Sequence, residues 1–393
     1  MRDPKIVIIG AGVAGITAGV IFKQAGFENF VIVEKGADVG GVCLTPDIPG
    51  IGRFTGAVVH TARWDDAIET AGKRIAVIGS GSTGVQVVSA LQPHAATLTQ
   101  FARTPQWVLW APMGLPQPRL LAKVLAAAPA AHQRLYSALL WSSGILADIA
   151  LKPTWRRRAA QQLARWSLTT QVRDRQLRAA LTPDYEPFCK RQVLSGTYHR
   201  AIGAGNAALV TEAISEITET GIRTADGTHH DLDVIVFATG FHPHNYMRPM
   251  NLRGRDGLSI DEAWAKGPRA YRMTAIPGFP NLFTVLGPNS PTGSISLQYS
   301  AELTARYITQ WLQRFRDDEF DTVEVTEEAT VRFNDSVADA MGPTVWNTGC
   351  NSWYFTEENT IDLWPFDRKT MTTLLTEPDD RDYLISHQDG TLS

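Results

Sequence analysis

The N-terminal part of the chain consists of short apolar runs separated by a cluster of glycines. The run Lys5–Ile9 predicts a buried strand, the stretch toward Gln24 predicts a helix, and the run Phe30–Val33 predicts a second strand. The turn between the first strand and the helix contains Gly10, Gly12 and Gly15. This order predicts a complete strand–helix–strand unit with a Gly-x-Gly-x-x-Gly turn.

The same pattern recurs further along the chain. The run Lys73–Ile78 predicts a strand, a helix follows through about Leu91, and Thr97–Phe101 predicts the next strand. The turn before this helix contains Gly79, Gly81, Ser82, Thr83 and Gly84. Two copies of one unit predict an α/β fold with two dinucleotide-binding, Rossmann-like domains.

One difference between the copies concerns the residue that follows the second strand of each unit. Glu34 lies nineteen residues after Gly15, and Arg103 lies nineteen residues after Gly84. An acid at this position accepts hydrogen bonds from a ribose, whereas a guanidinium binds a 2'-phosphate that an acid would repel. An isolated arginine here would be interpreted as a solvated residue, but the matched register favours recognition of a nucleotide. We therefore expect FAD at the first turn and NADPH at the second.

Composition and charge restrict the remaining possibilities. The chain has 393 residues, 44% of them hydrophobic and 20% charged, which is enough for two or three domains with their own cores. A net charge of -3 disfavours a nucleic-acid partner. The three cysteines have no metal-ligand spacing, so no metal site is expected. Glycines interrupt the apolar run after Lys5, which disfavours a secretory signal, and we expect a cytoplasmic protein.

Several motifs resemble those of one enzyme family. The segment from Phe54 through Gly56 and His60 to Trp64 and Asp65 resembles the Baeyer-Villiger monooxygenase signature, Phe-x-Gly-x-x-x-His-x-x-x-Trp-Pro/Asp, at every defined position. Further matches in family order are Gly40-Gly41, Phe188-Cys-Lys190-Arg191, Asp233 through Ala238-Thr239-Gly240-Phe241, Gly287-Pro-Asn289-Ser-Pro291, and the region around Trp353 and Trp364.

This resemblance implies a class B flavoprotein monooxygenase. Such an enzyme uses NADPH, FAD and dioxygen to convert a ketone to an ester or lactone through a peroxyflavin. By the same resemblance, Lys190 helps to hold the NADPH phosphate and Arg191 stabilises the peroxyflavin and the nicotinamide, while His60 couples the two nucleotide domains. From the residues alone, a surface basic pair is the favoured interpretation of Lys190 and Arg191, and a structural histidine that of His60.

The resemblance also assigns residues to the flavin site in the second half of the chain. The strand that ends before Ala238, Thr239 and Gly240 resembles the return of the chain to the flavin domain, where small residues let the backbone approach the cofactor. Asn289 precedes a predicted helix over Ser296–Phe315, whose N-terminus would face the flavin. A plain loop-to-helix turn explains Asn289 equally well. Gly41 completes the predicted flavin-binding set.

Residues from about Gly114 to Leu181 do not fit a nucleotide-binding fold. Apolar helical stretches over Leu120–Ala128 and Tyr136–Leu151 are followed by a run of arginines. This pattern predicts a helical insertion that faces the substrate. A helix that docks on a membrane surface is the less favoured alternative, and Pro129 and Asp148 keep the apolar runs too short to span a bilayer.

The expected domains are therefore an FAD-binding domain over 1–50 and 225–393 and an NADPH-binding domain over 51–224, with the insertion at about 114–181. After Cys43 the sequence passes within a few residues to a stretch that resembles the linker before the second unit. Members of the family place on the order of a hundred residues there, most of a domain. We expect an internal deletion and an incomplete flavin domain, so an NADPH-dependent flavin reductase or oxidase, or a non-catalytic nucleotide-binding remnant, stays an alternative to the monooxygenase.

Overall fold

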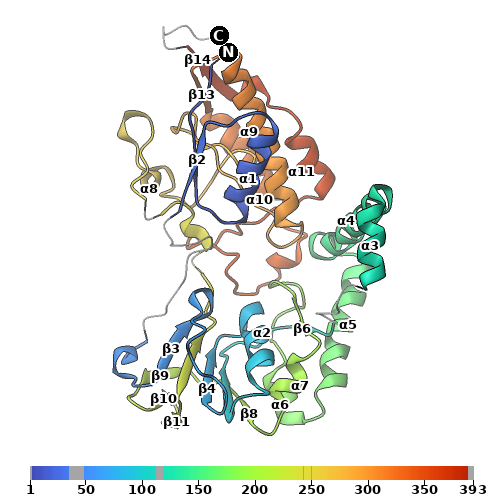
Figure 1. Cartoon of the computed structure of the whole chain (residues 1–393), viewed down its shortest axis with the longest axis vertical. Helices are drawn as coiled ribbons and strands as arrows, with labels where there is room; N and C mark the ends of the chain where they lie inside the picture. Colours follow the sequence, from blue (N-terminus) through green and yellow to red (C-terminus); the bar gives the residue numbers. More distant parts are fainter. Residues whose placement is uncertain (1, 35–47, 112–117, 242, 249, 388–393) are drawn as a thin grey trace. The chain divides into compact units, whose positions relative to one another are not determined.

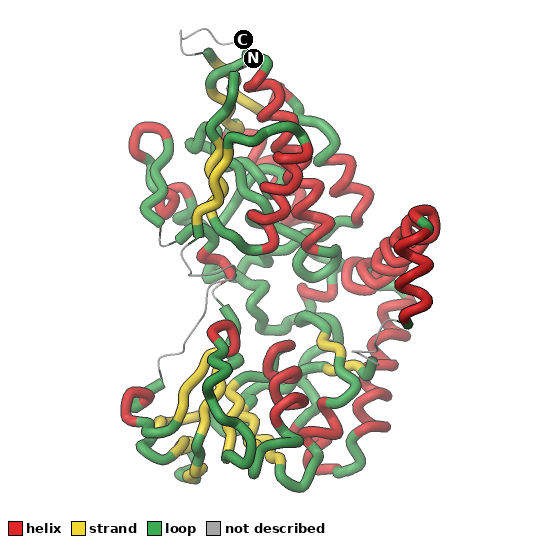
Figure 2. Tube along the Cα trace, in the orientation of Figure 1, coloured by secondary structure: helices red, strands yellow, loops and turns green. Residues whose placement is uncertain are grey.

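The computed structural model describes residues 2–34, 48–111, 118–241, 243–248 and 250–387. These residues form two compact units. The first comprises Met1–Gly40, Ala128–Arg157 and Pro243–Ser393, and the second comprises Gly41–Ala127 and Arg158–His242. Most strands of the second unit lie close together, whereas the first unit contains several long helices (Figure 2).

The second unit is built on a five-stranded parallel sheet (Figure 1). Its order is β3 (Ala57–His60), β12 (Val234–Phe237), β4 (Arg74–Ile78), β5 (Thr97–Phe101) and β8 (Ala207–Val210). Apolar side chains of the sheet are buried on both faces, as expected of parallel strands. The predicted strand–helix–strand unit of β4, α2 (Ser82–Leu91) and β5 is confirmed within one residue of its expected ends.

The two faces of this sheet are covered by different elements. On one face, Val77 and Leu98 pack with Val85 and Val88 of α2 and with Tyr198 of α7 (Tyr198–Ile202). The other face is covered by a three-stranded antiparallel sheet of β9 (Ile214–Ile217), β10 (Gly221–Thr224) and β11 (His229–Asp231). The remaining elements of this unit are β6 (Val108–Leu109), α3 (Arg119–Ala127), most of α5 (Trp155–Gln171), α6 (Arg175–Ala180) and β7 (Val193–Leu194).

The placement of β12 differs from the sequence-based expectation. We expected this strand to return the chain to the flavin domain, but it pairs with β3 on one side and β4 on the other, inside the second unit. All four of its residues are buried, because a central parallel strand is covered on both faces. The described chain passes to the first unit after this strand, at Pro243, and not near residue 225.

The first unit begins with the other predicted strand–helix–strand unit. Strand β1 (Ile6–Ile9) pairs in parallel with β2 (Phe30–Val33), and α1 (Val13–Gln24) connects them. Helix α9 (Leu297–Arg316) packs against α1. The other elements are α4 (Pro129–Leu151), α8 (Ile260–Ala263), β13 (Thr322–Val325), α10 (Glu327–Ala340), α11 (Arg368–Leu374) and β14 (Tyr383–Ser386), with β13 antiparallel to β14.

Strand β1 is buried on one face only, although the sequence predicted a buried strand. Ile8 packs toward α1 and α9, whereas Val7 is 61% exposed and Ile9 52% exposed. Among the residues that the structure describes, β2 is the only strand paired with β1. A cavity of about 480 Å³ follows β1 and is bounded by α1, α9 and the segment 281–287. Among the described residues this two-stranded sheet is smaller than the usual doubly wound sheet.

Candidate functional site

The glycine turn after β4 has a backbone that only glycine permits at two positions. Gly79 has φ +126°, and a Cβ there would collide with the carbonyl oxygen of Ala238. A Cβ on Gly84, in the first turn of α2, would collide with the carbonyl oxygen of Gly79. The collisions show that this turn folds tightly against both its own helix and the end of β12.

The middle glycine of the same turn borders open space. Gly81 is the N-cap of α2, and a Cβ added to it would meet no atom within 4 Å. No side chain caps this end of the helix. The backbone N–H groups of Ser82, Thr83 and Gly84, in the first turn, therefore have no capping side chain as an acceptor. An open, uncapped helix N-terminus after a glycine turn fits a pyrophosphate, which those N–H groups and the helix dipole would stabilise.

Arg103 lies beside this turn. The Ser80 hydroxyl donates a 2.7 Å hydrogen bond to the carbonyl oxygen of Thr104, which joins the glycine turn to the segment after β5. The Arg103 side chain is exposed and forms no ion pair with the residues that the structure describes. The position is therefore suitable for an anionic group of a nucleotide bound at the turn.

Lys190 is brought to the same corner of the second unit by Tyr185. The Lys190 ammonium lies 4.4 Å from the centre of the Tyr185 ring, and the Tyr185 hydroxyl donates to the carbonyl oxygen of Pro105, two residues after Arg103. Burial lowers the pKa of Lys190, while the nearby Asp184 carboxylate acts in the opposite direction. Arg103 and Lys190, eighty-seven residues apart, are thus linked through Pro105 and Tyr185.

The turn after β1 has the same construction. Gly10 has φ +97° and open space where a Cβ would lie, and a Cβ on Gly15 would collide with the carbonyl oxygen of Gly10. Gly12 is the N-cap of α1, again without a side-chain cap. The Glu34 carboxylate lies at this turn, because its Oε2 accepts a hydrogen bond from the backbone N–H of Ala11. The first turn therefore fits a pyrophosphate with an acid beside it.

His60 lies at the carboxyl end of β3, in register with Phe237 of β12. It is 8% exposed, its Nδ1 accepts a 3.1 Å hydrogen bond from the N–H of Ala62, and its ring contacts the Phe241 ring edge to face at 6.3 Å. These contacts fix the chain where two strands of the sheet end. The geometry suits a structural role for His60 at this edge.

Thr239 and Gly240 follow β12 and lie at the same sheet edge. Gly240 has φ +86°, and the preceding Ala238 abuts Gly79. Within the second unit these two residues therefore lie beside the second glycine turn.

Asn289 is buried in the first unit, with its polar groups bonded to protein atoms. Its backbone N–H donates a 2.5 Å hydrogen bond to Oδ1 of Asp362, and its side-chain amide donates to Asn334. Asp362 also accepts a hydrogen bond from the Tyr246 hydroxyl, and burial raises the pKa of this carboxyl group. Sequence reasoning missed Asp362, because a single acid in the C-terminal region carries no motif.

Arg191 is exposed on the loop that precedes β7, and no contact joins it to His60 in the described part of the chain. Gly41 lies outside the described residues. Within the described ranges no three His, Cys, Asp or Glu side chains gather in a way that could hold a metal ion. In those ranges no helix is both long enough and apolar enough to cross a membrane.

The sequence is similar to a nucleotide-binding family and to monooxygenases. The family described as NAD(P)-binding Rossmann-like domain matches residues 8–64. An uncharacterized monooxygenase of Mycobacterium tuberculosis is 47% identical over 322 residues, which are 82% of this chain and 64% of that protein. A Baeyer-Villiger monooxygenase of Streptomyces coelicolor is 37% identical over 331 residues, which are 81% of this chain and 62% of that protein. The chain thus spans less than two thirds of the length of these relatives.

Solved structures show the same fold. Cyclohexanone monooxygenase from Rhodococcus, bound to NADP+, superposes with a TM-score of 0.75 and 26% identity, covering 91% of this chain and 75% of that chain. A steroid monooxygenase bound to NADP superposes with a TM-score of 0.82 and 22% identity, covering 98% of this chain and 99% of that chain.

Proposed function

We propose that this chain, which is 37% identical to a Baeyer-Villiger monooxygenase, oxygenates a ketone to an ester or lactone with NADPH, FAD and dioxygen. The observation that carries the proposal is the pair of glycine turns that each precede a helix without a side-chain cap, with the acid Glu34 bonded at the first and the exposed cation Arg103 beside the second. When bound, NADPH supplies a hydride and FAD activates dioxygen.

At the second turn, Arg103 and Lys190 would hold the 2'-phosphate of NADPH. A guanidinium binds a phosphate through two parallel hydrogen bonds, and an ammonium adds a compact charge. The half-buried Lys190 has a lowered pKa, and a bound phosphate would favour its charged form. The N–H groups at the start of α2 would bind the pyrophosphate.

At the first turn, Gly10, Gly12 and Gly15 would let the backbone approach the FAD pyrophosphate, and Glu34 would accept hydrogen bonds from the adenosine ribose. The hydrogen bond from Ala11 holds the carboxylate at the turn. Asn289 would contribute to the FAD site through the backbone of its segment. Its own N–H group and its side-chain amide already donate hydrogen bonds to Asp362 and Asn334.

Arg191 would be the catalytic cation. A guanidinium group favours negative charge that develops on oxygen, so Arg191 would stabilise such charge during the reaction. His60 would position the edge of the sheet and take no part in proton transfer. Thr239 and Gly240 would keep the backbone close to the nucleotide at the second turn.

We further propose that the flavin domain is shortened by an internal deletion after Cys43. The exposed face of β1, the cavity along this strand and the span of less than two thirds of the relatives support the proposal. Retention of FAD is therefore the step on which the activity depends.

One preparation of the full chain tests the function. We expect a yellow protein whose flavin absorbance is bleached by NADPH under nitrogen and restored by air, and which forms one ester per NADPH consumed from a ketone such as cyclohexanone. Consumption of NADPH with hydrogen peroxide as the only product would assign a reductase or oxidase. A folded, colourless protein that binds NADPH but takes up no FAD would contradict the monooxygenase and support a nucleotide-binding remnant.

A further inference from the structure

Helix α3 exposes an apolar face that no described residue covers. None of its residues is buried, and Leu120, Leu121 and Val124 are exposed, with Leu120 at 75%. Their spacing of i, i+1 and i+4 places the three side chains on one face of the helix. Arg119 and Lys123, four residues apart, lie along the edge of this face next to Leu120. An amphipathic helix of this kind has an apolar face bordered by cations.

Helices α4 and α5 repeat this composition. In α4, Leu135, Tyr136 and Leu139 are exposed with the same i, i+1, i+4 spacing. In α5, Trp155 and Trp166 are 70% and 63% exposed and lie three turns apart on one face. Large exposed apolar side chains gathered on one face of a helix mark a surface that binds something apolar.

The charge of this segment is one-sided. Residues 119–173 contain nine Lys or Arg and one acid, Asp148, although the whole chain contains 37 basic and 40 acidic residues. Asp148 is paired with Lys152 at 2.8 Å. Arg156 and Arg158 are exposed beside Trp155, whereas Arg157 is buried and donates to backbone carbonyl groups. The positive charge next to the exposed aromatic side chains therefore faces solvent.

We infer that the helical segment 119–173 docks the protein on an anionic membrane surface. Tryptophan and leucine insert at the boundary between headgroups and acyl chains, while Lys and Arg bind anionic headgroups. Each of the helices carries its own apolar face with cations nearby, so a fluid lipid surface accommodates them without a shaped partner. The exposure of these side chains favours this role over the substrate-facing subdomain expected from sequence. The inference does not depend on FAD or on oxygenation.

Vesicle flotation of the full chain tests the inference. The probes are vesicles of phosphatidylcholine alone and vesicles of phosphatidylcholine with one quarter phosphatidylglycerol. We expect binding to the anionic vesicles that weakens as salt is raised, because the headgroup attraction is screened. The double variant Trp155→Glu/Trp166→Glu should reduce this binding at least about tenfold. The matched control Val331→Glu, at a 40% exposed apolar position on α10, should leave it unchanged.

Other outcomes would overturn the inference. The protein could bind neither kind of vesicle, or bind both kinds equally well. The control variant could also lose as much binding to the anionic vesicles as the double variant. A concentration-dependent dimer that is lost in the double variant would assign the surface to a second copy of the chain. If the double variant does not fold, as judged by circular dichroism, Arg156→Gln/Arg158→Gln replaces it. If the Arg156→Gln/Arg158→Gln variant bound the anionic vesicles as well as the wild type, the result would contradict the electrostatic part of the inference.

Discussion

The Glu34 carboxylate lies 2.7 Å from the backbone nitrogen of Ala11, inside the first glycine turn. The residue at the end of β2 is thereby fixed to the turn that follows β1. This one contact joins the two features that sequence reasoning combined into a flavin site, the glycines and the acid nineteen residues later.

Replacing Glu34 by glutamine should weaken FAD binding. The amide keeps the size of the side chain but loses the charge-assisted hydrogen bonds to ribose hydroxyl groups, which contribute roughly 1.5–3 kcal/mol each. We expect FAD affinity to fall at least about tenfold in a fluorescence titration. Glu28→Gln, at an exposed position before β2, is the control. Equal affinity of the Glu34 variant and the wild type would refute the assignment.

Two glycine variants should separate folding from NADPH binding. Gly84→Ala places a Cβ against the carbonyl oxygen of Gly79 and should destabilise the second unit by about 1–3 kcal/mol. Gly81→Ala meets no protein atom within 4 Å, and because alanine is a weaker N-cap than glycine it should cost at most about 1 kcal/mol. Its methyl group would still obstruct a pyrophosphate, so NADPH affinity should fall at least about tenfold.

Calorimetric titration with NADPH and thermal unfolding measure the two effects. If Gly81→Ala binds NADPH normally, the open space at α2 is not the pyrophosphate site. If Gly84→Ala is as stable as wild type, the close contact between Gly84 and the carbonyl oxygen of Gly79 is not present in the protein.

Arg103 should determine the preference for NADPH over NADH. Arg103→Gln removes a charge-assisted contact to the 2'-phosphate and should weaken NADPH binding by about ten- to a hundredfold while NADH binding changes little. Arg200→Gln, at an exposed position on α7, is the matched control. Equal weakening of both coenzymes would show that Arg103 supports the fold and not the 2'-phosphate.

Local sequence patterns predicted the elements around both glycine turns well. Gly10 and Gly79 adopt positive φ, and each is followed by a helix that begins within three residues. Such a unit is determined by neighbours in the sequence, since the strand, the turn and the helix contact one another directly. Arg103 and Glu34 could be matched because the two copies have equal spacing.

Long-range placement could not be predicted in the same way. Val234–Phe237 is a run of four apolar residues that would fit the centre of either sheet, and only the fold pairs it with β3 and β4. The contact of Asp362 with Asn289 spans 73 residues and has no motif. For α3 the sequence predicted the helix but not the exposure of Leu120, because amphipathic composition does not reveal what covers an apolar face.

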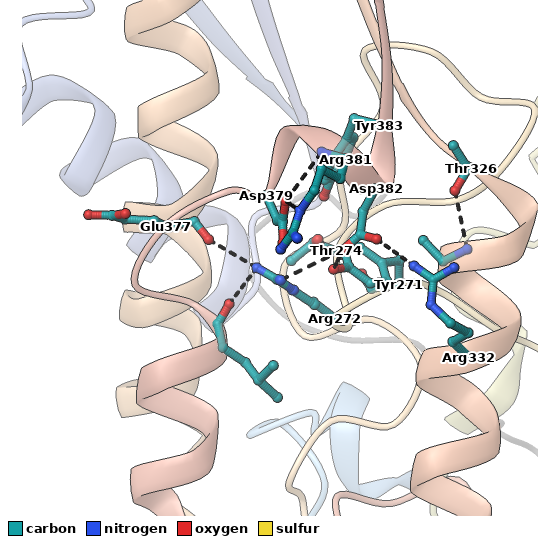
Figure 3. A network of polar contacts seen from close by, with 12 residues as sticks. Tyr271, Arg272, Thr274, Thr326, Arg332, Glu377, Asp379, Arg381, Asp382 and Tyr383 are labelled. Carbon is teal, nitrogen blue, oxygen red and sulfur yellow. Dashed lines mark hydrogen bonds and ion pairs between the residues drawn. The ribbon is translucent and has the colours of Figure 1, made fainter.

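Asp382 should be a main stabilising residue of the first unit. Its carboxylate accepts hydrogen bonds from the Tyr271 hydroxyl and from Arg332, and the Arg272 guanidinium lies 3.9 Å away (Figure 3). Asp382→Asn should lower the free energy of unfolding by about 2–3 kcal/mol, because buried Arg272 loses its nearest carboxylate.

The comparison variant lies in the same network. Asp379 pairs with Arg381, whose side chain is 89% exposed, and Asp379→Asn should therefore cost less than about 1 kcal/mol. Urea unfolding of both variants measures the difference. Similar losses for Asp382→Asn and Asp379→Asn would contradict the assignment of the network's stability to the buried carboxylate.

His199 should make the second unit less stable in mild acid. Burial lowers the pKa of this histidine to about 4 from an ordinary value of 6.5, and its Nδ1 lies 3.1 Å from Oε1 of Gln171. Above pH 6.5 the ring is neutral in both states and contributes nothing to the pH dependence. As pH falls below 6.5, the unfolded chain takes up a proton that the folded protein does not, so the free energy of unfolding decreases until about pH 4.

This loss should amount to about 2 kcal/mol between roughly pH 7.5 and 5, and His199→Gln should abolish it, since glutamine carries no titrating group. The wild-type and variant free energies of unfolding are compared by urea titration across this range, so that the titration of carboxyl groups cancels in the difference. His94→Gln, at an exposed position, should behave as wild type. A constant difference between His199→Gln and wild type at every pH would show that the folded protein binds the proton as readily as the unfolded chain.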